Sequence, residues 1–300
     1  MQDALERLMA LTGKICRNFL PYSWKAGLSH RFSQIRAWLL GPYATAVLTQ
    51  TTNGRLLIPS SDFVIGRALA FRGTYDPEMV ELLAARINER ASILVVSAHV
   101  GSLLIPLAKI AKTAIAIEAN PRTFEFLEMN LKLNDIRNVE AWNFAAGEVD
   151  GEVEFLANVH NTGQSKRRTR FALDNSCFTY DSPTTIQVPL RRLDGITNHD
   201  FDLILIDVEG SEAYAMAGMP QLLSRAKNVV IEICSDHYED PQDAQDRLLP
   251  FLASFENAII VEEEKSSRRI WRNSEFRDLI ANVFRAGFAN VLFWKCERGV

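Results

Sequence analysis

The chain has 300 residues, of which 47% are hydrophobic and 23% charged, with four cysteines and a formal net charge of −4. A chain of this size and composition can bury a large core without a disulfide or metal staple, and its charge disfavours a nucleic-acid partner. No apolar run reaches the ~18 residues of a membrane span, and no cysteines form a C-x-x-C pair, so we expect a cytoplasmic protein with reduced thiols.

The first 40 residues are predicted to be helical, because apolar side chains recur there at helical spacing and Pro21 separates two such stripes. Six basic residues accompany only two acidic ones in this segment. A basic amphipathic segment can lie weakly on an anionic membrane, although a cap or a contact in a homo-oligomer is the more common role.

Residues 45–59 are predicted to form a β-hairpin, because Asn53-Gly54 lies between two β-prone runs. We therefore divide the chain into an N-terminal region of helices and hairpin, residues 1–75, and a main domain, residues 76–300. The N-terminal region is expected to act as a cap or an oligomer contact.

The main domain is predicted to have an α/β fold, with a Rossmann-like parallel sheet covered by helices on both faces. A helix is expected at 76–87, and from residue 92 apolar runs alternate with helical segments through short linkers. The predicted strands are residues 93–96, 114–117, 139–144, 201–206, 228–233, 258–262 and 289–295.

A polar stretch, residues 158–183, interrupts this alternation between two added strands at 152–156 and 185–189. A loop of that length inside a compact domain usually serves as a lid or a binding segment. We expect it to lie over the site.

The turn after the first strand of the sheet contains the small residues Ser97, Ala98 and Gly101 beside His99. Ligands of open α/β sheets bind at the carboxyl ends of the strands, where small residues let the backbone approach them. The turn lacks the G-x-G-x-x-G pattern, so a dinucleotide site is disfavoured. Glu118 ends the second strand, where an acid can accept hydrogen bonds from both ribose hydroxyls of a nucleoside.

An apolar strand delivers three carboxylates, Asp207, Glu209 and Glu212, within six residues. Crowded carboxylates can act as a base, orient a substrate or hold a divalent ion. Because no His or Cys joins the cluster, we predict no metal. His237 follows the next strand and is a second candidate base.

A basic run lies within the polar stretch. Lys166, Arg167 and Arg168 follow Ser165 and are candidates to bind a phosphate or carboxylate of the substrate. The alternative is a solvated loop.

The ordered set of motifs resembles the FkbM family of S-adenosylmethionine-dependent methyltransferases. The segments that carry the resemblance are residues 96–101, 117–121, 130–134, 138–139, 145–147, 161–165, 188–190, 193–194 and 206–212, with Glu232 on the next strand. The resemblance implies a seven-stranded class I methyltransferase sheet with one antiparallel hairpin strand. It also implies S-adenosyl-L-methionine as cofactor and O-methylation of a small-molecule or glycan acceptor, such as a sugar, glycolipid or secondary metabolite.

On this interpretation Glu118 binds the ribose, the turn from Ser97 to Gly101 binds the methionine end of the cofactor, and Ala145 lies near the adenine. Asp207, Glu209 and His237 then face the acceptor.

Four positions depart from the family pattern. Val95 stands where the family has Asp, Ser97 where it has Gly, His99 where it has Asn, and Leu205 where it has Lys. The alternative function is therefore a catalytically degenerate binding or structural protein with a methyltransferase fold.

Overall fold

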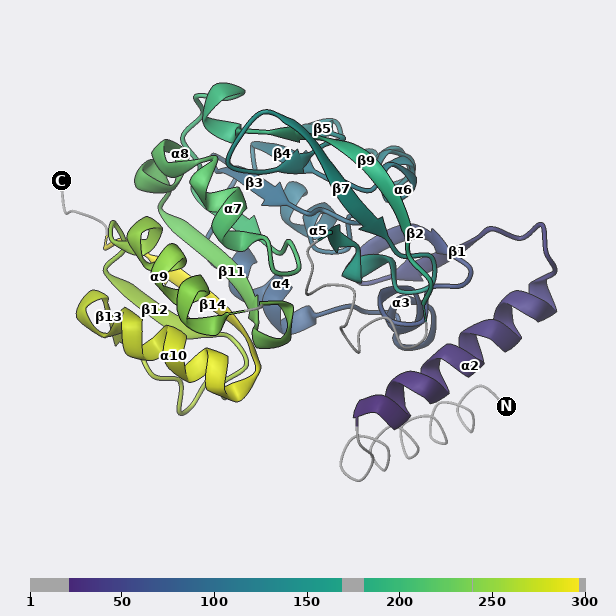
Figure 1. The fold of residues 1–300 in the computed structure, drawn as a ribbon. Coiled ribbons are helices and arrows are strands. Elements are labelled where there is room, and N and C mark those ends of the chain that lie inside the picture. Colours follow the sequence, from purple (N-terminus) through teal and green to yellow (C-terminus); the bar gives the residue numbers. More distant parts are fainter. Residues whose placement is uncertain (1–21, 169–180, 239, 297–300) are drawn as a thin grey trace.

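The computed structural model describes residues 22–168, 181–238 and 240–296 (Figure 1). Its main sheet has the strand order β13-β12-β14-β11-β10-β3-β4-β5. The strands are β3 (Ser92–Val96), β4 (Thr113–Ile117), β5 (Val139–Trp142), β10 (Leu203–Ile206), β11 (Asn228–Cys234), β12 (Asn257–Ile260), β13 (Trp271–Arg272) and β14 (Phe288–Trp294). All seven predicted strands are present, and the two-residue strand β13 adds an eighth at the edge. Neighbours from β5 to β11 are parallel, whereas β14 runs antiparallel to both β11 and β12.

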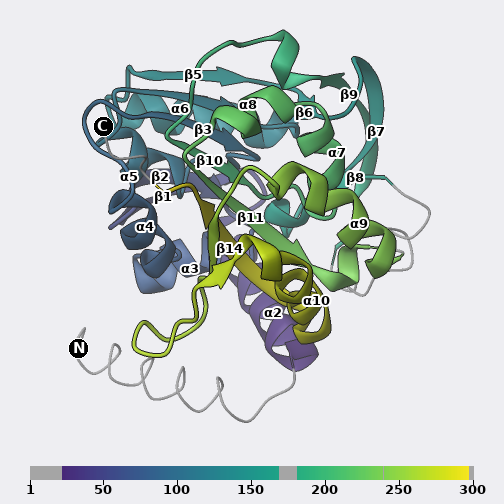
Figure 2. The same ribbon diagram turned by 90° about the vertical axis from the view of Figure 1, so that its left-hand side faces the viewer.

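Helices cover both faces of this sheet, as predicted (Figure 2). One face carries α7 (Glu212–Ala217), α8 (Pro220–Arg225), α9 (Pro241–Leu252) and α10 (Phe276–Ala286), and the other carries α3 (Ile65–Arg72), α4 (Pro77–Ala84), α5 (Leu104–Ala108) and α6 (Pro121–Leu133). Side chains alternate along each strand, so Leu94 and Val96 pack under α7–α10 while Ile93 and Val95 pack under α3–α6. The apolar side chains of each strand are therefore divided between two clusters, one on each face of the sheet.

The helix predicted at 76–87 begins as expected and ends at Ala84. Asp76 caps it by accepting a hydrogen bond from the Met79 amide at 3.2 Å, and Pro77 occupies its first turn. The helix α3 was not predicted from the sequence.

The predicted hairpin is confirmed as β1 (Ala46–Thr51) and β2 (Gly54–Pro59), with Thr51 paired to Gly54 across the turn. Its Leu56 belongs to the apolar cluster under α3–α6. Asn130 of α6 also accepts a hydrogen bond from the Leu57 amide and donates one to its carbonyl. The hairpin therefore shares the core of the main domain.

Before the hairpin, α2 (Tyr22–Leu40) extends from the body of the molecule (Figure 1). The Arg36 guanidinium ties it to the body through the carbonyls of Ser60 and Asp62. Trp38 and Leu39 are exposed. The apolar stripe expected within residues 1–21 lies outside the described residues, and among those described we find no helix with the length and apolar character to cross a bilayer.

A second, four-stranded sheet has the order β6-β9-β7-β8. Its strands are β6 (Ala145–Ala146), β7 (Gly151–Ala157), β8 (Lys166–Arg167) and β9 (Thr184–Arg191). β7 and β9 are the predicted added strand pair, and they run antiparallel. The predicted lid contains β8 and the 3-10 turn η1 (Thr162–Gln164), and its residues 169–180 lie outside the described part. Two further turns follow sheet strands, η4 (Leu193–Gly195) and η5 (Ser235–His237), and η6 (Asn273–Glu275) precedes α10.

Candidate active site

The turn after β3 is fastened to the end of β4. The amides of Ser97 and Ala98 both donate to the Ile117 carbonyl at 2.8 Å, and the His99 amide donates to Glu118 Oε2 at 2.8 Å. Ser97 and His99 have positive φ, 72° and 51°, in the left-handed region where side chains other than Gly or Asn are strained. These contacts place His99 beside Glu118.

Glu118 is a buried carboxyl group supported by main-chain donors. It is 5% exposed, and its Oε1 accepts a hydrogen bond from the Asn120 amide at 2.9 Å. Burial raises the pKa of Glu118 to about 7, against the hydrogen bonds from Asn120 and His99, which lower it. Each carboxylate oxygen can accept a further bond, so Glu118 suits a ligand that offers hydroxyl donors.

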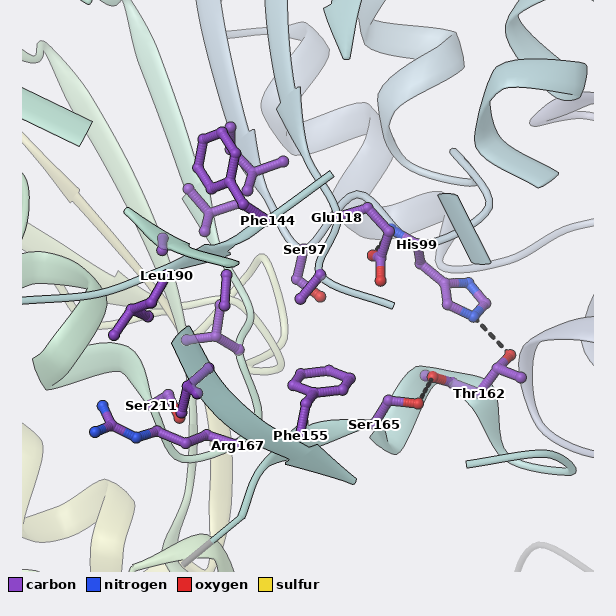
Figure 3. A pocket seen from close by; sticks show the side chains of 18 residues that line it. Ser97, His99, Glu118, Phe144, Phe155, Thr162, Ser165, Arg167, Leu190 and Ser211 are labelled. Carbon is purple, nitrogen blue, oxygen red and sulfur yellow. Dashed lines mark hydrogen bonds between the residues drawn. The ribbon is translucent and has the colours of Figure 1, made fainter. Parts of the chain in front are cut away.

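A cavity opens beside Glu118 (Figure 3), with about 590 Å³ of atom-free space that includes its opening to solvent. Its lining consists of Val96, Ser97, His99, Ile117, Glu118, Ala119, Phe144, Ala145, Ala146, Val153, Phe155, Thr162, Gly163, Ser165, Arg167, Leu190, Val208 and Ser211. Pockets for cofactors are of this kind, with apolar walls and a few placed polar groups.

Four of the six predicted cofactor residues line this cavity: Ser97, His99, Glu118 and Ala145. The other two lie outside its lining. Ala98 is buried in the apolar cluster under α3–α6. Gly101 has φ 91°, and a Cβ there would lie 3.1 Å from Ile105 and Leu127, so this glycine lets the turn pack against helices.

The sequence did not predict the wall of the cavity that lies opposite Glu118 and comes from the second sheet. Phe155 and Leu190 come from β7 and β9, and Phe144 precedes β6. The alternating pattern predicted these strands, but their position over the main sheet could not be read from it. Thr162 was within the motif at residues 161–165, although no role was assigned to it.

Three carboxylates meet at the ends of β10 and β11. One oxygen each of Asp207, Glu209 and Glu232 lies within 4.8 Å of the others. None of the three lines the cavity, whereas Val208 and Ser211 of the same loop do. The loop therefore separates the cavity from this acidic cluster, which we define as Asp207, Glu209 and Glu232.

Burial dominates the electrostatics of the acidic cluster. It raises the pKa of Asp207, Glu209 and Glu232, and the like charge of Asp207 raises the pKa values of the other two further. A hydrogen bond between Asp207 and Glu232 lowers the pKa of the former and raises that of the latter. Neighbouring carboxyl groups resist joint ionisation, so burial and mutual repulsion both favour the protonated form within the cluster.

His237 lies beside the acidic cluster, so the expectation that no histidine joins these carboxylates is wrong. Its Nδ1 lies 3.0 Å from Glu209 Oε2, and its side chain is 3% exposed. Burial, followed by the charge of Lys166, lowers the pKa of His237 to about 3, so the ring is neutral at physiological pH. Gly210 has φ 90°, and a Cβ there would lie 2.7 Å from His237 Cβ and from its carbonyl oxygen. Only glycine permits this close approach.

Glu212 supports the loop and does not belong to the acidic cluster. It accepts hydrogen bonds from the amides of Val208 and Gly210 at 3.3 and 3.0 Å, and from the Tyr238 hydroxyl. Burial raises the pKa of Glu212 to about 6.

The basic run divides three ways. Lys166 is buried, and its charge lowers the pKa values of Glu209 and His237. Arg167 lines the cavity with Ser165, but it also pairs with Glu148 at 3.1 Å. Arg168 pairs with Glu154 at 3.4 Å on the surface. The structure thus brings Ser165 and Arg167 to the cavity and Lys166 to the acidic cluster, and leaves Arg168 away from both.

Two of the departures from the family pattern are neighbours in space. Val95 of β3 pairs in register with Leu205 of β10, and both are buried in the cluster under α3–α6, at 2% and 3% exposure. An Asp and a Lys at these positions would lie side by side. Replacing a buried ion pair by apolar residues is often neutral or stabilising, so an apolar pair at these positions is compatible with a stable core.

Residues 96–288 match the Methyltransferase FkbM domain family, and the chain belongs to this family. No curated protein matches the chain. Similar solved structures include an FkbM methyltransferase from Methylobacillus flagellatus, at 15% identity and a TM-score of 0.43 over 69% of this chain and 44% of that one. The chain thus spans less than half of that protein.

Two other similar structures are methyltransferases with different names. One is a precorrin-6y C5,15-methyltransferase from Geobacter metallireducens, at 13% identity and a TM-score of 0.37 over 74% of this chain and 93% of that one. The other is a tRNA m1G37 methyltransferase from M. jannaschii, at 11% identity and a TM-score of 0.41 over 86% and 59%. These similarities are too distant to indicate a substrate.

Proposed function

We propose that this member of the FkbM methyltransferase family binds S-adenosylmethionine in the cavity and methylates a hydroxyl oxygen of a small-molecule or glycan acceptor. The observation that carries the proposal is Glu118, a buried carboxyl group that two main-chain amides hold at the cavity wall. A buried carboxyl group is costly unless it is hydrogen-bonded, and beyond the two amides the oxygens of Glu118 can accept further hydrogen bonds from a ligand.

The cavity residues fit the nucleoside half of that cofactor. Phe144, Ala145 and Leu190 offer an apolar surface for a flat base, and Glu118 offers acceptors for the ribose hydroxyls. When bound, S-adenosylmethionine supplies an electrophilic methyl group on its sulfonium. The protein must then align the acceptor oxygen and take up its proton.

The acidic cluster fits the role of proton acceptor. Asp207 and Glu209 flank Val208 in the loop whose Val208 and Ser211 line the cavity, so both carboxyl groups lie next to residues of the cavity wall. The acceptor hydroxyl loses its proton when it is methylated, and the carboxylate of Asp207, or His237 beside Glu209, would take up that proton. Both versions stay open in this proposal.

The alternative of a degenerate, catalytically silent protein rested on the four departures from the family pattern. Two of these departures, Val95 and Leu205, pair in register in the core, so they affect one place in the sheet and not two.

Calorimetry with S-adenosylmethionine and S-adenosylhomocysteine tests the proposal. We expect one binding site for each ligand in the native protein and a large loss of affinity in Glu118→Ala. Mass spectrometry of metabolites and glycolipids from a deletion strain should then reveal an acceptor that lacks one methyl group. Absence of binding by either ligand would contradict the proposal.

A further inference from the structure

Helix α2 turns its apolar side chains away from the body of the molecule. Four of them recur at helical spacing along one side and are more than half exposed: Phe32, Ile35, Trp38 and Leu39. Ser33, on the opposite side, is 2% exposed, and the Arg36 guanidinium on that side donates to the Ser60 carbonyl. A surface helix normally buries its apolar side, so α2 has the reverse orientation. We call the four exposed side chains the α2 face.

Exposed apolar side chains continue next to the α2 face. Tyr43, in the loop after α2, is 96% exposed, and Val64 and Phe71, at the start and near the end of α3, are 39% and 49% exposed. Burial lowers the pKa of Arg36, and the nearby charge of Arg67 in α3 lowers it further. The two helices are therefore neighbours (Figure 1). Exposed apolar surface of this extent usually marks an interaction site.

The same part of the chain is strongly basic. Residues 22–73 contain six basic residues and one acidic residue, Asp62, whose side chain is buried. Residues 74–300 contain 24 basic and 34 acidic residues. Arg31 on α2 and Arg72 on α3 are both exposed. Positive charge and exposed apolar side chains are thus concentrated in one region of a chain that is acidic elsewhere.

Helix α2 is also fastened to the segment that lines the cavity. Arg36 donates to the Asp62 carbonyl at 2.8 Å, and the Asp62 carboxylate accepts from the Thr162 hydroxyl at 2.7 Å. The rings of His30 and His160 meet edge to face, with their centroids 5.7 Å apart. Thr162 lines the cavity. A partner that binds the α2 face is therefore connected to the cavity wall through a short series of contacts.

We propose that the α2 face, together with Tyr43 and the exposed side chains of α3, binds the surface of an anionic lipid bilayer. The inference goes beyond the proposed function, since it requires no ligand in the cavity. Tryptophan and tyrosine are enriched at the interface between bilayer and water. Aliphatic side chains enter the boundary between headgroups and acyl chains, and neighbouring arginines are attracted to anionic headgroups.

A bilayer fits this surface better than a second copy of the chain or a nucleic acid. A two-fold dimer through the α2 face would bring the arginines of the two copies together, and like charges across an interface are costly. Nucleic acids are bound through phosphates and base faces. Aliphatic side chains such as Ile35 and Leu39 would have no partner there.

Flotation of the whole chain with lipid vesicles tests the proposal. We expect binding to vesicles of phosphatidylcholine and phosphatidylglycerol in equal parts, and binding at least about 10-fold weaker to vesicles of phosphatidylcholine alone, because only the former attract the arginines. Raising the salt concentration from about 0.1 M to about 1 M should weaken binding to the anionic vesicles, since it shortens the Debye length from about 10 Å to about 3 Å.

The double variant Trp38→Gln with Leu39→Gln tests the apolar contribution. Its binding to anionic vesicles should fall at least about 10-fold, because two large apolar side chains no longer leave water. The matched control, Ile196→Gln with Ile270→Gln, replaces apolar side chains that are 38% and 52% exposed in other parts of the chain. It should bind like the native protein.

The double variant Arg31→Gln with Arg72→Gln tests the charge. We expect binding to anionic vesicles to weaken about 5-fold for each arginine removed, and binding to phosphatidylcholine vesicles to change little. The control Arg90→Gln with Arg285→Gln removes the same charge from two other exposed positions and should have little effect on either.

Light scattering identifies a second copy as the partner. If the native chain is a dimer that Trp38→Gln with Leu39→Gln converts to a monomer, the α2 face joins two copies and the proposal fails. It also fails if the native chain binds neither kind of vesicle, or if the control variants lose as much binding as the α2 variants. Calorimetry with S-adenosylhomocysteine on Trp38→Gln with Leu39→Gln should give the native affinity, so the failure of this inference and the failure of the proposed function are measured separately.

Discussion

The cavity beside Glu118 and the acidic cluster lie at the same edge of one sheet, yet they are built in opposite ways. In the cavity a single carboxyl group is surrounded by apolar side chains and supported by main-chain amides. In the acidic cluster three carboxyl groups crowd together beside a neutral histidine and a buried lysine. The cavity is suited to binding a defined ligand, and the acidic cluster is suited to accepting and releasing a proton.

The loop after β10 joins the two regions. Val208 and Ser211 face the cavity, while Asp207 and Glu209 belong to the acidic cluster. We therefore expect changes in the acidic cluster to affect turnover and changes in the cavity to affect cofactor affinity.

The largest effect is expected from Asp207→Asn. Replacing this carboxylate by a neutral amide of the same shape should lower kcat about 10²–10⁴-fold, the usual contribution of a positioned acid–base group. Affinity for S-adenosylhomocysteine should stay the same. The assay follows transfer of a labelled methyl group to the acceptor, with Asp200→Asn, an exposed partner of Arg225, as control. Full activity in Asp207→Asn, Glu209→Gln and His237→Ala would move the chemistry away from the acidic cluster.

The strand beneath the cavity offers the next test. Val95→Asp should lower the free energy of unfolding by about 3–5 kcal/mol, because it leaves an unpaired charge in the core. Val95→Asp with Leu205→Lys should recover more than half of this loss, since the two residues are in register. Denaturant titrations measure both, and Val95→Asn provides the uncharged control. Additive losses in the double variant would show that the two sites do not compensate each other.

Glu118→Ala probes the cavity directly. We expect S-adenosylhomocysteine binding to weaken by ~1.5–3 kcal/mol, the cost of losing hydrogen bonds to a charged group. Titration calorimetry measures the change, and Asp207→Asn serves as the matched variant from the other region. An unchanged affinity in Glu118→Ala would contradict the role assigned to Glu118, because the cavity would then bind the ligand through other groups.

The pH dependence of cofactor binding gives a second test of the role of Glu118. The pKa of Glu118 is raised to about 7. In the free protein its carboxyl group is therefore mostly protonated below pH 7 and mostly ionised above it. Ribose hydroxyls prefer the ionised acceptor, so affinity should rise about tenfold per pH unit below pH 7 and level off above it. Calorimetry in buffers of different ionisation enthalpy should show proton release on binding at pH 6. Glu118→Gln should remove the dependence, and a slope that persists in this variant would point to another group.

The smallest effect concerns backbone strain at the cavity mouth. Ser97 has φ 72°, so Ser97→Gly should stabilise the protein by about 0.5–1 kcal/mol, because relief of the left-handed strain exceeds the added chain entropy. Thermal unfolding measures the shift in Tm. Ser211→Gly, where φ is −108°, should instead lose stability. A fall in Tm for Ser97→Gly would show that the serine hydroxyl contributes more than the strain costs.

Much of the fold was predictable, because its signals are local. All seven main strands and the hairpin at Asn53-Gly54 were predicted from apolar runs and turn residues. The strand β13 and the turn η1 were missed, since they span only two and three residues. Of the site, Glu118 and His99 were found because both follow strands of the sheet, whereas Asp62 was not considered at all.

By itself the sequence determined that the ends of β3, β4 and β10 meet at one edge, because parallel strands with short connections place their carboxyl ends together. Only the tertiary structure decided which side chains at that edge contact one another or line the same cavity. Asp62 and Thr162 are 100 residues apart in the chain but in contact in the fold. Alternation along a strand predicts two faces but does not say what covers each, so the wall of the cavity that β7 and β9 supply depends on how the second sheet packs over the first.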